Sequence, residues 1–407
     1  MAETLLDKLL SKINILFRCS GTNIAIGKAA PTNTKRNRCV YVINLILLNT
    51  DVLGSTCWFI SGLKSGKSFT ELTYIAPCII LSILSDMKSM SIIIYEKKVY
   101  QLMENLRMME AHERIRENTA ERGKIIEKGV NFLNLVINVL YVLNIILLVC
   151  FAFHPLVVMM LNYKKTNEIE LLLPFPIVYP FDAYNIKVWP VIYLRQIWSE
   201  IVAVFNICAA DFAFYNFCSY ITIQFRLLQY DIEHVITGTQ KSIYNDEMRS
   251  GRIRNKLVEI IKRHQELITC VNLLENIYSV SMLYNFISSS VIICLTGFNV
   301  TENKDMILVI TFFTFLFMGL LQILFLSFFG DMLMDASIEV SNAVYNSKWY
   351  LVPPKTRKTL LLILTRAQKP CKLTAYGFAD VSLKAFMKVL STSWSYFALL
   401  KTVYSTE

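Results

Sequence analysis

The chain has 407 residues, of which 54% are hydrophobic and only 18% are charged, and its mean hydropathy is +0.44. An ordinary soluble domain carries about 25% charged residues. The composition therefore excludes a soluble globular protein and predicts an integral membrane protein, with a formal net charge of +10.

The first segment, residues 1–17, has a helical pattern of apolar residues. Leu6, Leu9, Leu10 and Ile13 share one side of a helix, and acidic and basic residues are interleaved with them. A cleavable secretory signal has instead a basic start and an unbroken apolar core. The pattern predicts an amphipathic segment that lies on the membrane or against the protein.

Seven segments are apolar and long enough, at about 20 residues each, to cross a bilayer as helices. They are residues 40–62, 72–94, 130–153, 197–222, 272–298, 306–330 and 381–404. They take up much of the chain and leave no room for an independent soluble domain. We therefore predict an all-α protein with a single seven-helix membrane domain over residues 1–407.

Two acidic residues interrupt the apolar segments, Asp51 near the middle of the first span and Asp211 near the middle of the fourth. A central aspartate costs about 2.5–3.5 kcal/mol on insertion scales, so both side chains should face protein or water. One interpretation is an ion or proton path. The other, which we favour, is a polar clamp between helices.

The basic residues predict the orientation in the membrane. Alternate loops and the N-terminal segment hold thirty lysines and arginines, whereas the other side holds eight. Positive charge stays on the cytoplasmic side. The N-terminus is therefore expected inside and the C-terminus outside, with anionic lipid rather than nucleic acid as the partner of this charge.

Three connections have their own signals. The polar loops around residues 101–128 and 226–262 are helix-prone and should continue the spans into the cytoplasm. The outer loop, 154–196, is rich in proline and aromatic residues and should form a compact cap. Residues 355–368 lie between prolines and predict a cytoplasmic anchor helix of three to four turns.

The last span differs from the others because hydroxyl residues interrupt it. One helical face carries Thr392, Ser395, Leu399, Thr402 and Val403. Such a face can line a water-filled path, and a ring of apolar residues can close that path by dewetting. One copy of the helix cannot surround a pore, so this interpretation requires an oligomer. The alternative is a tightly packed helix with small residues at its contacts.

No catalytic motif is present: the chain has no P-loop, no nucleophile elbow and no HExxH. Its cysteines and histidines lack the spacing of metal ligands. We therefore expect no enzyme activity, metal or cofactor. Aromatic residues in the fourth and sixth spans allow a cavity for a small apolar ligand.

Residues 365–370 (TRAQKP) and 393–400 (SWSYFALL), with Trp349-Tyr350 before them, stand in the order and spacing of a C-terminal signature. In these residues the chain resembles the insect odorant receptor family. The outer-loop residues Leu173-Pro174 and 179–182 (YPFD) are also similar to that family.

The resemblance implies an odorant-gated, nonselective cation channel with four subunits around one pore, in the plasma membrane of an olfactory neuron dendrite. The last span would line this pore and close it at Leu399 and Val403. The loop 223–269 lacks the insertion of the family's co-receptor, so the chain resembles a ligand-tuning subunit that works with that co-receptor in a heterotetramer. Lys401 departs from the apolar residue expected beside the gate.

The family's pocket for volatile odorants or pheromones lies in the outer half of the bundle. By depth alone, its candidate residues here are Tyr74, Cys78, Leu148, Phe205 and Phe312. The alternative function is a seven-helix chemoreceptor that signals through G proteins. That alternative requires the opposite orientation and the Asp-Arg-Tyr and Asn-Pro-x-x-Tyr motifs, which the chain lacks. A transporter is a third possibility, weakened because no internal repeat is visible.

Overall fold

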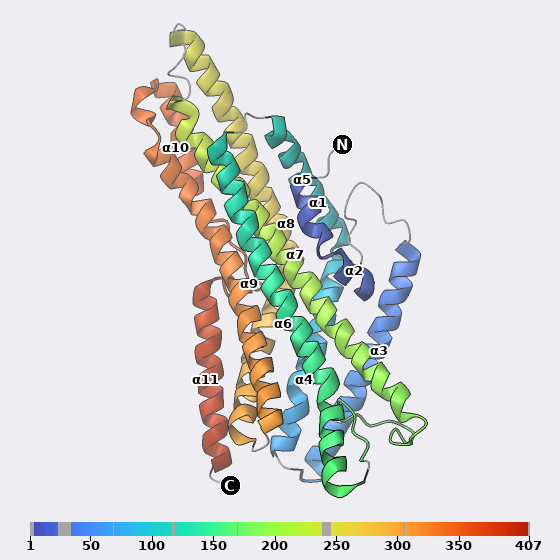
Figure 1. Cartoon of the computed structure of the whole chain (residues 1–407). Coiled ribbons are helices and arrows are strands. Elements are labelled where there is room, and N and C mark those ends of the chain that lie inside the picture. Colours follow the sequence, from blue (N-terminus) through green and yellow to red (C-terminus); the bar gives the residue numbers. More distant parts are fainter. Residues whose placement is uncertain are drawn as a thin grey trace.

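The computed structural model is a bundle of long helices (Figure 1). It describes residues 4–22, 34–67, 69–115, 119–168, 170–237, 246–303 and 306–405. The helices are α1 (Leu5–Ser11), α2 (Asn14–Ser20), α3 (Thr34–Lys64), α4 (Phe69–Ile94), α5 (Glu96–Ile115), α6 (Ala120–Thr166), α7 (Trp189–Thr237), α8 (Asp246–Glu302), α9 (Met306–Asn346), α10 (Pro354–Ala367) and α11 (Leu383–Ser405). A 3₁₀ turn, Trp349–Leu351, precedes α10. All of these elements are helical, so the predicted all-α fold is confirmed.

Among the described residues, six helices are long and apolar enough to cross a membrane: α3, α4, α6, α7, α8 and α9. They contain the first six predicted spans. Helix α11 covers the seventh predicted span but is not among the six, because its serines, threonines and three lysines lower its hydropathy. The crossing of the membrane by α11 therefore stays a prediction.

The long helices continue well past the apolar segments, as the polar loops predicted. Helix α6 has 47 residues and α8 has 57. Part of the loop predicted at 223–269, residues 238–245, lies outside the described residues. On both sides of that part, the chain is helical.

A buried cluster of charges holds these extensions together. Arg263 on α8 pairs with Glu113 on α5 at 2.7 Å and with Asp231 on α7 at 2.8 Å. Arg122 on α6 pairs with the same two acids. Because each charge faces two opposite ones, the ring offsets the cost of removing four ionised groups from water.

Helix α7 forms the centre of the bundle and contacts α2, α3, α4, α6, α8 and α9. Its aromatic side chains Phe214, Phe217 and Phe225 are fully buried. The N-terminal helices α1 and α2 pack against α5 and α7 and bury the predicted apolar stripe, including Leu6 and Leu10. Of the two expected positions for this segment, the structure has the one against the protein.

The outer loop forms the predicted cap. Gln196 on α7 accepts a hydrogen bond from the Phe175 backbone at 3.0 Å and donates one to the Tyr179 hydroxyl at 3.0 Å. The Trp189 indole donates to the Leu172 carbonyl at 2.9 Å. These bonds hold the segment against the first turns of α7. The ends of the loop predicted at 154–196 are instead helical, in α6 up to Thr166 and in α7 from Trp189.

The connection from α10 to α11 is fixed on α8 and α9. Glu275 of α8 accepts hydrogen bonds from the backbone of Thr374, at 2.6 Å, and from its hydroxyl. Val381 then passes so close to Gly330 of α9 that a Cβ at Gly330 would lie 2.4 Å from the Val381 carbonyl oxygen. The start of α11 is therefore set by a backbone contact with α9.

We expect Gly330→Ala to destabilise the protein by about 1–3 kcal/mol, since Gly330 lies inside α9 and the Val381 backbone is held by its hydrogen bond to the Leu373 carbonyl at 2.8 Å. The midpoint of thermal unfolding of the detergent-solubilised protein measures this effect. Gly123→Ala on α6 is the matched control, because no heavy atom lies within 4 Å of its added Cβ. Equal midpoints for the two variants would contradict the close contact.

Candidate functional site

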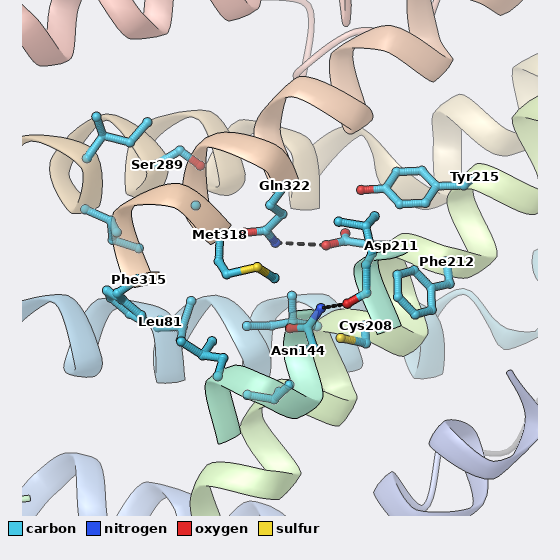
Figure 2. A pocket seen from close by; sticks show the side chains of 17 residues that line it. Leu81, Asn144, Cys208, Asp211, Phe212, Tyr215, Ser289, Phe315, Met318 and Gln322 are labelled. Atoms are coloured by element: carbon cyan, nitrogen blue, oxygen red, sulfur yellow. Dashed lines mark hydrogen bonds between the residues drawn. The ribbon is translucent and has the colours of Figure 1, made fainter. Parts of the chain in front are cut away.

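A cavity lies at the centre of the bundle, among α4, α6, α7, α8 and α9 (Figure 2). Most of its walls are apolar. Its apolar lining includes Leu81, Leu147, Phe212, Phe315 and Met318. A site of this kind suits a small apolar molecule and recognises its shape.

One end of this cavity is polar because Asp211 of α7 lies there. Lys88 of α4 donates to one oxygen of Asp211 at 2.6 Å. Gln322 of α9 donates to the other at 2.8 Å (Figure 2). Lys88 is 2% exposed and Asp211 is 4% exposed. Lys88, Asp211 and Gln322 together join three helices, and the ion pair leaves no net charge, as the clamp interpretation of Asp211 requires.

Tyr215 of α7 lines the same polar end. Its ring stacks on Phe329 of α9, with centroids 4.7 Å apart and planes at 22°. The stacking holds the ring, and Figure 2 shows the hydroxyl directed into the cavity on the side of Gln322. Asn144 of α6 also lines the cavity and donates to the Leu140 carbonyl at 2.8 Å.

A second cavity adjoins the first towards the outer loop, among α3, α4, α6 and α7. The two share the wall residues Leu81, Leu147, Val204 and Phe315. Asp51 of α3 lines the second cavity and accepts hydrogen bonds from Ser199, at 2.6 Å, and from Arg195. The clamp interpretation of Asp51 therefore also holds.

The five residues proposed from depth for a pocket lie in three places. Cys78 lines the second cavity. Tyr74 and Phe312 contact each other edge to face, with ring centroids 5.5 Å apart. Leu148 and Phe205 line a separate groove between α6 and α7, together with Leu16 of α2.

Several polar residues of the cavities were not identified in the sequence: Lys88, Asn144, Glu200 and Gln322. Glu200 lines the second cavity, and its Oε2 atom is buried without a hydrogen-bond partner among the described residues. The signal was available, because each is a polar residue inside or beside an apolar segment. Within the described ranges, no cluster of three or more His, Cys, Asp or Glu side chains could hold a metal ion.

Helix α11 stands at the edge of the bundle, against α8 and α9 (Figure 1). Its inner side buries Val389 and Ser393, and Tyr404 packs edge to face on Phe298. The other side is uncovered, with Leu399 61% exposed and Val403 53% exposed.

The hydroxyl residues of α11 follow the same division. Ser395 and Thr402 are exposed and donate to backbone carbonyls of their own helix, at 3.0 and 2.9 Å. Thr392 is half-buried. The face proposed from the sequence to line a pore is therefore turned away from this chain's own bundle.

Comparison with known proteins identifies the family. The model of the seven-helix odorant receptor family matches residues 67–394. The chain is 26% identical over 372 residues to putative odorant receptor 92a of Drosophila melanogaster, covering 90% of this chain and 88% of that protein. It is 27% identical over 366 residues to odorant receptor 67c of the same species, covering 89% and 87%.

Solved structures share the fold. The olfactory receptor OR5 of Machilis hrabei in complex with eugenol aligns over 98% of both chains, with a TM-score of 0.79 and 19% sequence identity. A second structure of the same receptor aligns with a TM-score of 0.78 and 18% identity, over 97% of this chain and 98% of that one. With its apolar helices, the chain is a multi-pass membrane protein, and it belongs to the insect odorant receptor family.

Proposed function

We propose that this chain is a subunit of an odorant-gated, nonselective cation channel. The observation that supports this most is the uncovered face of α11, where exposed hydroxyl residues are followed by the exposed side chains of Leu399 and Val403. A lone apolar side chain in contact with water is unfavourable, whereas four copies of this face around an axis would form a narrow ring. Thr392 and Ser395 would line the path below that ring, and Thr402 would line it at the level of the ring, between Leu399 and Val403 along the helix.

The orientation in the proposal follows from the charges. The N-terminal segment and alternate connections of the chain carry thirty of its 41 lysines and arginines, whereas the connections between them carry eight. Cytoplasmic loops carry such an excess. We propose that the N-terminus is cytoplasmic, that the C-terminus is extracellular, and that the protein resides in the plasma membrane of the sensory dendrite.

The proposed partner is the co-receptor of the family, in a heterotetramer. The cytoplasmic end of the chain leaves apolar side chains uncovered, among them Leu361 and Leu362 of α10 and Tyr345 of α9. Exposed apolar patches of this kind mark contacts with other proteins. The short loop between α7 and α8 supports a ligand-tuning subunit.

The proposed ligand is a small volatile or semi-volatile molecule that is largely apolar, and its site is the central cavity with the adjoining second cavity. The apolar lining of both supports this. So does the fold shared with a receptor that was solved in complex with eugenol. The five residues proposed from depth remain candidates, with Cys78 at the second cavity itself.

We expect cells that make this chain together with the co-receptor to show cation currents when a volatile panel is applied. The co-receptor alone is the control, and it should not respond to the same odorants.

Staining intact cells for tags at the two termini of the protein reports its orientation in the membrane, and only the C-terminal tag should be stained. An extracellular N-terminus, or responses that require a G protein, would instead favour a G-protein-coupled chemoreceptor.

A further inference from the structure

The polar end of the central cavity has a fixed arrangement of hydrogen-bonding groups. Only the amide nitrogen of Gln322 can donate to the Asp211 carboxylate, so this bond determines which way the amide points. The amide oxygen is then left as an acceptor, and Figure 2 shows it turned away from Asp211. The amide of Asn144 is oriented in the same way, because its nitrogen donates a hydrogen bond to the Leu140 carbonyl.

The Tyr215 hydroxyl is the donor at this end. Tyr215 is 1% exposed, and within the described part of the chain its hydroxyl has no protein hydrogen-bond partner; the oxygen is not enclosed by protein atoms but is open to the cavity that the residue lines. Buried hydroxyls nearly always have a partner, and a buried one without it costs free energy. A hydroxyl held in place by ring stacking and directed into an apolar cavity therefore indicates a missing partner that enters the cavity.

We propose that the central cavity binds odorants that carry a hydroxyl group on an apolar skeleton. The ligand hydroxyl accepts a hydrogen bond from Tyr215 and donates one to the amide oxygen of Gln322. This inference rests on the proposed function and adds the chemical class of the ligand.

The donor and the acceptor at the polar end rank ligands that share one carbon skeleton by their affinity for the cavity. A hydroxyl uses both the donor and the acceptor at the polar end, whereas an aldehyde or ketone uses only the donor, and a hydrocarbon uses neither. Asp211 does not attract cationic ligands, because Lys88 already neutralises it at 2.6 Å. A site built for a hydrogen-bonding group rejects analogues that lack it, since its polar atoms are then left unpaired.

The test compares currents from cells that make the co-receptor with this chain or with its Tyr215→Phe variant. The panel holds volatile alcohols, each with the aldehyde or ketone and the hydrocarbon of the same skeleton. We expect the original chain to respond to an alcohol at the lowest concentrations. Tyr215→Phe should raise the half-maximal concentration of that alcohol about five- to tenfold and leave that of the hydrocarbon unchanged.

Tyr278→Phe is the matched control. It also removes one buried hydroxyl, which donates to the Ala210 carbonyl at 3.2 Å, but Tyr278 does not line the cavity. Tyr278→Phe should shift the half-maximal concentrations of all ligands alike. The currents of both variants are divided by the amount of protein stained at the cell surface, which corrects for expression. If the original chain prefers hydrocarbons, or if Tyr215→Phe shifts the half-maximal concentrations of all ligands equally, this inference is overturned while the proposed function stands. A complete absence of odorant-evoked current would contradict the proposed function and, with it, this inference.

Discussion

Replacing Lys88 by methionine should destabilise the protein by about 3–5 kcal/mol, the cost of leaving one charge of a buried pair without its partner. Lys88 is 2% exposed, and its Nζ atom lies 2.6 Å from Asp211. Methionine has a similar length and no charge, so Asp211 would remain buried with only Gln322 as a donor. The amount of protein at the cell surface and the unfolding midpoint in detergent should both fall.

The double variant Lys88→Met, Asp211→Asn tests the cause. Asparagine removes the unpaired charge and keeps an oxygen that can accept from Gln322, so most of the lost stability should return. Arg38→Met is the control for the loss of a salt bridge that is not buried. Arg38 pairs with Glu96 at the surface, where their side chains are 71% and 47% exposed. Exposed pairs contribute at most about 1 kcal/mol. A Lys88→Met protein as stable as the original would mean that Asp211 is uncharged in the fold.

The positions of the helices could be predicted from the sequence, and so could their continuation into the polar loops, but the residues at which they begin and end could not. Hydropathy marks only the part of a helix that lies in hydrocarbon, so the fifth span was predicted at 272–298, whereas α8 runs from Asp246 to Glu302. The rest of α8 is stabilised by tertiary ion pairs, such as Arg263 with Asp231. Such pairs join residues far apart in the sequence and leave no periodic signal.

The pocket was the least predictable feature. Depth in the membrane places a residue along the bundle axis but not around the helix, and this is why Leu148 and Phe205 lie on a separate groove. The polar residues of the central cavity depend on contacts among α4, α7 and α9. Asp211 stands out in the sequence because a charged residue in the middle of a membrane span costs free energy. Its partner Lys88 is determined by the packing of α4 against α7 and cannot be identified from the sequence.

By contrast, most of the exposed side of α11 could be predicted, because the helix alone determines which residues share a side. The i, i+3, i+4 rule groups Thr392, Ser395, Leu399, Thr402 and Val403, and all of these are exposed except the half-buried Thr392. What the periodicity of one helix cannot provide is the identity of the surface that this face meets. The assignment of the gate therefore stays a proposal that calls for a functional test.

We expect Leu399→Ala and Val403→Ala each to raise the resting conductance of the channel several-fold in the absence of odorant. If these side chains form the apolar ring, truncating them widens the constriction and lets water, and then ions, occupy it. The unfolded population should change little, because Leu399 is 61% exposed and Val403 is 53% exposed in the single chain. Holding current before odorant addition, divided by surface protein, measures the effect.

Leu400→Ala is the matched control, since it removes the same side chain from the next position of α11. Leu400 is half-buried and not on the uncovered face, so its loss should weaken packing without raising the resting current. A ring of apolar residues at an axis acts locally, whereas weaker packing of α11 would cause leak from either leucine. Leak in Leu400→Ala equal to that in Leu399→Ala would therefore assign the effect to packing, and unchanged leak in both gate variants would put the constriction elsewhere along the helix.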